Sequence, residues 1–207
     1  MGYKNREIEV KMVVMAGEKP YNHIAGINNV ISKHFSKSRF KYIEGFSADT
    51  YWNKINNPHK IGFFRVREME DGTCQLTVKE QDKGNNYDRV EIDVGSYDSP
   101  KQAILLMTQL LGPNLGVIKK KYYVHVLDSD HEEKPTVSVY QIKGDNRVFV
   151  EIEAHSSKEV ERLRAEVAEV LQWSFGVYLE VETNSLFSIF IKGAKGVKKT
   201  RKVKKIG

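Results

Sequence analysis

The sequence has almost no cysteine and no long apolar segment. Its 207 residues include one cysteine, Cys74, which excludes an internal disulfide framework and a zinc site built on cysteines. The longest uninterrupted apolar stretch, residues 103–107, is far shorter than the roughly 20 residues that a membrane-spanning helix needs. Charged residues at 7, 9 and 11 interrupt the place where a secretory signal peptide would have its apolar core. These features predict a protein of the reducing cytoplasm that makes no membrane contact.

An excess of one charge is confined to the last sixteen residues. The whole chain has a formal net charge of +6, but residues 192–207 contain eight Lys or Arg and no Asp or Glu. The remaining residues, 1–191, therefore carry a net charge of about −2. We expect one domain over 1–191 and a basic tail over 192–207. Such a tail is either solvated and disordered, or it contacts nucleic acid or another polyanion.

Apolar periodicity alternates between strand and helix character along the domain. Two-residue alternation indicates strands, and apolar residues spaced three or four apart indicate helices. The pattern predicts strands over 5–15, 63–69, 73–80, 87–94, 116–127, 136–143 and 147–154, and helices over 21–35, from 99 to before 112, and from 156 onward. With about eight mostly antiparallel strands and three main helices, the fold class is α+β.

Turn and capping residues support these boundaries. Asp71-Gly72 is typical of a hairpin turn between two strands. Ser99 followed by Pro100 is typical of a helix N-terminus. Ser156 with Glu159 forms a capping box that predicts the start of the last main helix.

Charged side chains recur two residues apart on the predicted strands, and often with the same sign. Side chains alternate across a strand, so residues i and i+2 share a face about 6.6–7 Å apart. Two like charges at that distance repel by about 2–2.5 kcal/mol at an effective dielectric constant of 20. The charged faces contain Glu7, Glu9 and Lys11; Arg65 and Arg67; Lys79; Arg89, Glu91 and Asp93; Lys119 and Lys121; and Glu151 and Glu153.

Two arrangements satisfy this pattern. The charged faces can point inward and enclose a cavity suited to a polyphosphate and a divalent cation, while helices cover the outer apolar faces. Alternatively, the charges can form a ladder of salt bridges on the outside of a sheet. Charge counting alone does not separate the two.

Several short motifs, in this order, resemble those of one family. Glu7-Ile8-Glu9-Val10-Lys11 is similar to the ExExK signature of the CYTH superfamily, the triphosphate tunnel metalloenzymes. The segments that resemble its later motifs are Asp49-Thr50-Tyr51-Trp52, Arg65-Val66-Arg67, Leu76-Thr77-Val78-Lys79, Arg89-Val90-Glu91-Ile92-Asp93, Lys119-Lys120-Lys121, Phe149-Val150-Glu151-Ile152-Glu153 and Ser185-Leu186-Phe187. The resemblance covers about residues 5–190.

The resemblance implies an eight-stranded antiparallel β tunnel, a closed barrel with a charged interior, that binds a triphosphate-containing small molecule with Mg²⁺ or Mn²⁺. It implies a metal site made of Glu7, Glu9, Glu151 and Glu153. Glu91 and Asp93 would orient the basic residues. Phosphate oxygens would be held by Lys11, Arg65, Arg67, Lys79, Arg89, Lys119 and Lys121, of which Lys11, Arg65 and Lys79 would be the catalytic residues.

The sequence departs from the family pattern at Tyr140, which stands where many relatives carry an Asp.

Three functions are compatible with the sequence. The first is a metal-dependent triphosphatase, and the second is a class IV adenylyl cyclase that makes cyclic AMP from ATP. The third is a triphosphate- or RNA-binding module without turnover.

Overall fold

The structure is a computed structural model that describes residues 4–36, 40–53, 61–80, 89–97, 99–129 and 134–191; the expected basic tail, 192–207, lies outside these ranges. The described residues contain ten strands and four helices. The strands are β1 (Lys4–Ala16), β2 (Lys19–Pro20), β3 (Phe40–Trp52), β4 (Ile61–Met69), β5 (Cys74–Glu80), β6 (Arg89–Tyr97), β7 (Gly116–Leu127), β8 (Thr136–Ile142), β9 (Val148–Ala154) and β10 (Tyr178–Val181). The helices are α1 (Ile24–Phe35), α2 (Pro100–Leu111), α3 (Ser157–Phe175) and α4 (Leu186–Phe190).

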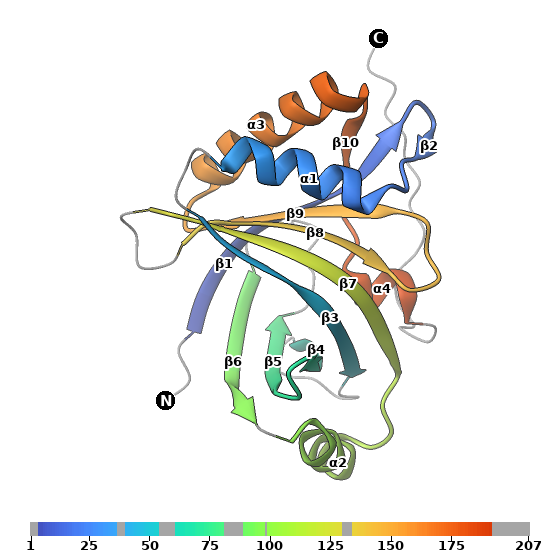
Figure 1. The fold of residues 1–207 in the computed structure, drawn as a ribbon. Coiled ribbons are helices and arrows are strands. Elements are labelled where there is room, and N and C mark those ends of the chain that lie inside the picture. The colour runs from blue at the N-terminus through green and yellow to red at the C-terminus, as the bar shows by residue number, and fades with distance from the viewer. Residues whose placement is uncertain are drawn as a thin grey trace.

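One antiparallel sheet curls into a tunnel (Figure 1). Its strands follow one another in the order β6-β5-β4-β3-β7-β8-β9, and β1 pairs with both end strands of this series, β6 and β9. The two short strands β2 and β10 add to β1. The predicted α+β class and the eight-stranded antiparallel tunnel are confirmed.

The predicted capping and turn residues occupy the positions expected from the sequence. Ser99 and Ser156 cap α2 and α3, and each accepts a hydrogen bond from the backbone N–H three residues later. Gly72 adopts a φ of +83° in the hairpin between β4 and β5, a conformation that favours glycine. These local preferences fix where the predicted elements begin and end.

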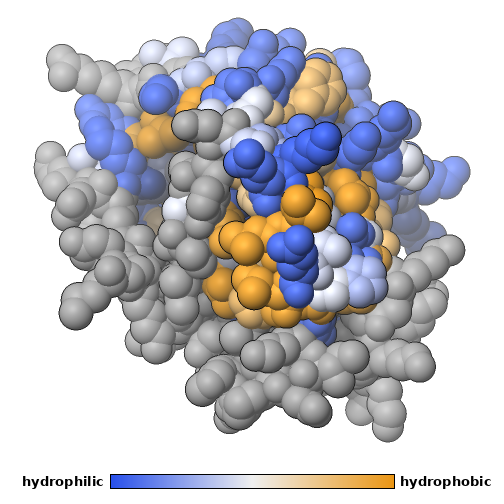
Figure 2. Space-filling model, turned by 90° about the horizontal axis from the view of Figure 1, so that it is seen from below, coloured by the Kyte–Doolittle hydropathy of each residue, from blue (hydrophilic) through white to orange (hydrophobic). Residues whose placement is uncertain are grey.

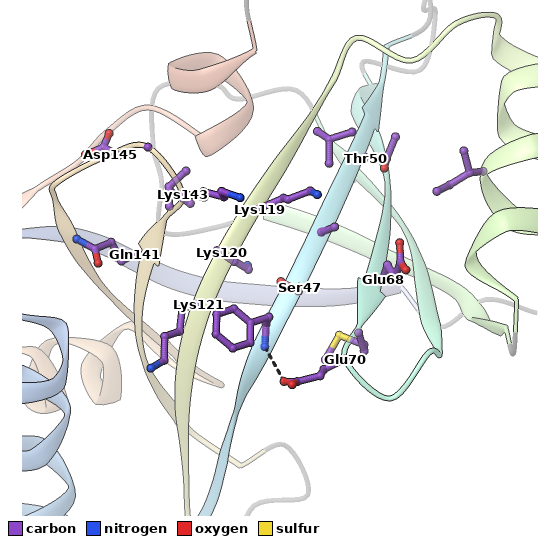
Figure 3. Close-up of a pocket in the computed structure, with 17 residues that line it drawn as sticks. Ser47, Thr50, Glu68, Glu70, Lys119, Lys120, Lys121, Gln141, Lys143 and Asp145 are labelled. Atoms are coloured by element: carbon purple, nitrogen blue, oxygen red, sulfur yellow. Dashed lines mark hydrogen bonds between the residues drawn. The ribbon is translucent and has the colours of Figure 1, made fainter.

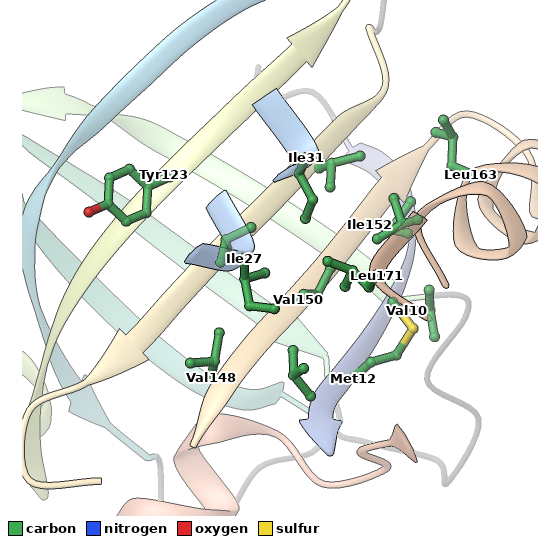
Figure 4. Close-up of a cluster of buried hydrophobic side chains, with 14 of the residues drawn as sticks. Val10, Met12, Ile27, Ile31, Tyr123, Val148, Val150, Ile152, Leu163 and Leu171 are labelled. Carbon is green, nitrogen blue, oxygen red and sulfur yellow. The ribbon is translucent and has the colours of Figure 1, made fainter. Parts of the chain in front are cut away.

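The largest apolar core lies outside the tunnel. Alternate residues of β1, β8 and β9 point away from the tunnel interior and pack beneath α1 and α3 (Figure 4). Val10, Met12 and Ile152 are fully buried there, as are Ile27 of α1 and Leu163 of α3. The tunnel is thus a sheet whose apolar side faces outward and is covered by two helices.

A second helix-covered region lies on the other side of the tunnel. Ala103 and Met107 of α2 pack against Val66, Leu76 and Cys74. The opposite face of α2 leaves Leu105, Leu106 and Leu110 exposed, and apolar side chains gather at this end of the molecule (Figure 2). No helix among the described residues is long and apolar enough to cross a membrane.

The sequence pattern missed β3 and the short elements β2, β10 and α4. The inward side of β3 carries Gly45, Ser47 and Asp49, so the apolar alternation that identifies a strand is absent there. The three short elements have only two, four and five residues, too few for a clear period. All four form through pairing or packing with their neighbours, not through a pattern of their own.

A buried polar contact fastens α1 to the sheet. His125 of β7 is fully buried, and its Nε2 lies 3.0 Å from Oδ1 of Asn28 in α1. Asn28 in turn donates to the Tyr42 hydroxyl at 3.1 Å. Burial lowers the pKa of His125 to about 4. The neutral imidazole is therefore the form that the folded protein stabilises.

The burial of His125 predicts an acid-sensitive contribution to stability. The pKa of His125 is lower in the folded than in the unfolded chain, so the unfolded chain binds more protons and stability is lost as the pH falls from about 6.5 to about 4. The loss reaches at most about 3 kcal/mol. In urea denaturation at pH 7, 5.5 and 4.5, His125→Gln should show a smaller loss of unfolding free energy than the wild type. Equal losses in the two proteins would contradict this role of His125.

Candidate functional site

The inner face of the tunnel carries charged side chains that are removed from water. Exposed fractions are 5% for Glu9, 5% for Lys11 and 6% for Lys79, and Asp49 is fully buried. Charged groups at such positions need partners, because each isolated buried charge costs several kcal/mol. The inward arrangement of the charged faces is therefore the one that the fold adopts on β1, β4, β5 and β9.

Three carboxylates meet where β1 pairs with β9. Glu9 lies directly opposite Glu153, and Lys11 lies opposite Glu151. One oxygen from each of Glu9, Glu151 and Glu153 lies within 4.8 Å of the other two. Like charges directly opposite one another in a sheet repel. This cluster fits a hard divalent cation such as Mg²⁺ or Mn²⁺, for which carboxylate oxygens are the usual ligands.

The carboxylate of Glu151 is held ionised by the cations around it. Burial alone would raise its pKa, but Lys11, Lys79 and Lys120, together with a hydrogen bond from Tyr140, lower it to about 2. The Tyr140 hydroxyl donates to Oε2 of Glu151 at 2.8 Å. Glu151 is thus negatively charged throughout the neutral pH range.

A second charged group surrounds Asp49 on β3. Arg67 donates two hydrogen bonds to its carboxylate, from Nε at 2.9 Å and from Nη2 at 3.1 Å, and Lys120 Nζ lies 3.5 Å from Oδ2. Although burial opposes ionisation, Arg67, Lys120 and Arg65 hold the pKa of Asp49 well below its usual range. Burial and the nearby Arg67 lower the pKa of Lys120 to about 8.

Two more cations of the interior are fixed by neighbouring strands. Arg65 of β4 and Thr77 of β5 lie opposite each other, and Arg65 Nη2 donates to the Thr77 hydroxyl at 3.2 Å. Lys79 Nζ lies 3.4 Å from Oε2 of Glu9, which joins the carboxylate cluster to the lysines. The interior therefore contains acidic and basic groups within one continuous network.

Four of the expected site residues have side chains outside the described part of the structure. The backbones of Glu7 and Arg89 pair directly between β1 and β6. The backbones of Glu91 and Asp93 pair with Lys79 and Thr77 of β5. Their expected roles stay predictions.

Lys119 and Lys121 lie on the outer face of β7, not in the interior as expected. They pair with Ala48 and Phe46 of β3, and both side chains are exposed. With Lys143 they line an outer groove of about 890 Å³, and Glu68 and Glu70 lie on its β4 side (Figure 3). The expectation was wrong because, in a run of three lysines, the sequence does not show which ones point into the tunnel. A shift of one residue exchanges the inward and outward faces of a strand.

Lys120 is the residue of this run that points into the tunnel, where its side chain is 10% exposed. Sequence reasoning missed it, and it also missed the contact between Tyr140 and Glu151. The signal for Lys120 is the alternation of Ile118, Lys120 and Tyr122, which is informative only once the register with β3 is known. Asp49 supplies that register, because it lies opposite Ile118 and beside Lys120.

One end of the interior is apolar. Tyr51, Phe63 and Phe187 form a ring cluster with centroid distances of 5.3–5.6 Å, and Phe187 comes from α4. Phe149 precedes Glu151 on the inward side of β9 and belongs to the same core. The inner face therefore changes from aromatic to charged along β9.

Comparison with known proteins identifies the fold. No family model matches the sequence, and neither does any curated protein. Among solved structures, the PH1012 protein of Pyrococcus horikoshii OT3 matches with a TM-score of 0.58 and 22% identity over 88% of this chain and 98% of that one. HpAC1 of Hippeastrum matches with a TM-score of 0.54 and 14% identity over 89% of this chain and 94% of that one. It is a proposed adenylyl cyclase described as having a dominant triphosphatase activity.

A third similar structure is a proposed adenylate cyclase of Bacillus halodurans, bh2851. It matches with a TM-score of 0.51 and 12% identity over 89% of this chain and 98% of that one. The chain therefore has the fold of these proteins, as the resemblance to the triphosphate tunnel metalloenzymes predicted.

The network around Asp49 predicts a large structural effect of its removal. Asp49→Asn takes a buried counter-charge away from Arg67 and Lys120, and we expect a loss of about 3–5 kcal/mol of unfolding free energy. Asp128→Asn is the control, because Asp128 and Lys134 form an exposed ion pair whose loss costs about 0–1 kcal/mol. Chemical denaturation of the three proteins measures both effects. A loss below about 1 kcal/mol for Asp49→Asn would show that its ion pairs do not stabilise the fold.

Proposed function

We propose that this protein hydrolyses a triphosphate inside its tunnel with the help of a divalent cation. The proposal rests chiefly on one observation: the Glu9–Glu151–Glu153 cluster shares the interior with buried cationic side chains. A polyphosphate chelated to a metal ion needs both kinds of group at once, cations for its oxygens and carboxylates for the metal.

The interior basic residues are the proposed phosphate ligands. Lys11, Arg65, Arg67, Lys79 and Lys120 would bind the phosphate oxygens, with Arg89 completing the set expected from the motifs. Lys11, Arg65 and Lys79 are the proposed catalytic residues, because groups preorganised in a dry cavity stabilise the charge that develops at phosphorus. Lys120 replaces Lys119 and Lys121 in this proposal, since it is the inward member of the run.

The carboxylates have a different role in the proposal. Glu9, Glu151 and Glu153 would hold the Mg²⁺ or Mn²⁺ ion, with Glu7 as the further expected ligand, and Glu91 and Asp93 would orient the basic residues. When bound, the ion would neutralise phosphate charge and act as a Lewis acid. Hydrolysis breaks one phosphoanhydride bond, with water entering at phosphorus and a phosphate leaving.

The fold leaves two reactions to be separated by experiment. HpAC1 supports triphosphate hydrolysis, and the two proposed cyclases with this fold support the formation of cyclic AMP from ATP. Purified protein should be incubated with tripolyphosphate, ATP and thiamine triphosphate in Mg²⁺ or Mn²⁺, and the products resolved by ³¹P NMR. Metal-dependent release of orthophosphate is the expected result. Cyclic AMP with diphosphate would identify a cyclase, and tight binding without turnover would identify a binding module.

The proposed roles predict a contrast between the two faces of the sheet. Glu9→Ala and Lys11→Ala should each lower the rate of triphosphate hydrolysis more than about 10-fold, equivalent to a loss of more than about 1.4 kcal/mol of transition-state stabilisation. Lys119→Ala and Lys121→Ala remove the same kind of charge as Lys11→Ala, but from the outer groove, and should keep the rate within about twofold. Steady-state rates and circular dichroism of the four variants test this. Equal losses on both faces would contradict the interior site.

We also propose that the basic tail, residues 192–207, binds RNA or another polyanion. Eight basic and no acidic side chains in sixteen residues support an electrostatic contact. Deleting 192–207 should weaken binding of a single-stranded RNA and reduce its dependence on salt, while triphosphate hydrolysis stays unchanged. Fluorescence anisotropy at about 50 and 200 mM salt measures this. An unchanged RNA affinity at low salt would exclude the tail as a binding element.

A further inference from the structure

In each carboxylate of the interior cluster, Oε2 accepts a contact from a different side chain. Tyr140 of β8 donates to Oε2 of Glu151 at 2.8 Å, and Thr136 of β8 donates to Oε2 of Glu153 at 3.1 Å. Lys79 of β5 lies 3.4 Å from Oε2 of Glu9. The cluster is thus surrounded by donors that fix the rotation of its carboxylates.

The two hydroxyl donors are themselves held in place. Tyr140 is 3% exposed, and its ring stacks on Phe149 with a centroid distance of 5.3 Å and an angle of 9°. Lys120 Nζ lies 5.3 Å from the centre of the Tyr140 ring. Thr136 lies directly opposite Glu153 in the pairing of β8 with β9. The Tyr140 hydroxyl therefore cannot follow its carboxylate without disturbing this packing, and Thr136 is held beside Glu153 by the strand register.

A fixed hydroxyl limits how a carboxylate can bind a metal ion. An oxygen that accepts a hydrogen bond has one lone pair fewer for a cation. The effect is stronger for Glu151, with a contact of 2.8 Å, than for Glu153, with a contact of 3.1 Å, and it favours binding through the other oxygen of each. Binding through one oxygen suits Mg²⁺ and Mn²⁺, which take six ligands in octahedral geometry. Ca²⁺ takes six to eight oxygens and often uses both oxygens of a carboxylate.

We propose that Tyr140 and Thr136 are positioning residues that hold Glu151 and Glu153 in one-oxygen coordination and so favour Mg²⁺ or Mn²⁺ over Ca²⁺. The inference rests on the proposed function, because it concerns the cation of that site. It also gives a definite role to Tyr140, the residue at which the sequence departs from the expected family pattern.

The test compares metal affinities without any triphosphate present. Mn²⁺ binding is followed by electron paramagnetic resonance, and Ca²⁺ affinity is obtained by competition with Mn²⁺. Tyr140→Phe removes only the hydroxyl and should weaken Mn²⁺ binding about 10-fold. Ca²⁺ affinity should fall less, because Glu151 can then offer both oxygens, so the ratio of Mn²⁺ to Ca²⁺ affinity decreases. Thr136→Val should change the ratio in the same direction, and Thr136→Ser should restore it.

The control for Tyr140→Phe is Tyr122→Phe. Tyr122 is the residue of β7 that pairs with Tyr140, and it lies against Gly45 of β3. This variant also removes a tyrosine hydroxyl from the inner face and should leave both metal affinities unchanged. Thermal unfolding checks that all variants are folded. A general loss of packing would lower both affinities together, whereas the proposed role changes their ratio.

Two results would overturn the proposal, and they differ. If Glu151→Gln abolishes Mn²⁺ binding but Tyr140→Phe leaves the affinities and their ratio within about twofold of the wild type, the positioning role is wrong and the cation site stands. If the wild type does not bind Mn²⁺, or Glu151→Gln binds it equally well, the cation site of the proposed function fails together with this inference.

Discussion

The structure depends on keeping charged side chains inside a sheet without leaving any of them uncompensated. A single buried ion costs several kcal/mol, a large share of the stability of a domain. Asp49 meets this constraint through Arg67 and Lys120, and Glu151 through Lys11, Lys79 and Lys120. The acidic and basic groups are therefore mutually required, and the charged network proposed as the site for a polyanion and its cation also contributes to the stability of the fold.

A charged interior forces the hydrophobic core to the outside. The apolar residues of β1, β8 and β9 can be removed from water only beneath helices, and α1 and α3 supply that cover. The buried contact of His125 with Asn28 is one polar link between this layer and the sheet. Lys119 and Lys121 lie on a part of the outer face where their side chains are exposed, and they can therefore stay charged and solvated there.

The arrangement of charged residues inside and apolar residues outside also explains what the sequence could predict. Strands whose charges face one side and whose apolar residues face the other, such as β1 and β9, were recognised, and their inward carboxylates were expected. β3 was missed because its inward residues are small or polar, and Lys120 was missed because neighbouring lysines hide the alternation. Contacts such as that of Tyr140 with Glu151 depend on the register between strands, which no single segment contains.

The change from aromatic to charged side chains along the interior limits how a ligand can be bound. On β9, Phe149 lies in the aromatic cluster with Phe187, while Glu151 and Glu153 lie farther along the strand in the charged region. A polyphosphate loses much hydration on entering a low-dielectric cavity, and the cationic side chains of the charged region can compensate for that loss. At the aromatic end, the guanidinium of Arg147 packs over the rings of Phe149 and Phe190 and is already paired with Asp145. In the proposed site, a phosphate chain would therefore lie in the charged segment, beside the carboxylates that would hold its metal ion.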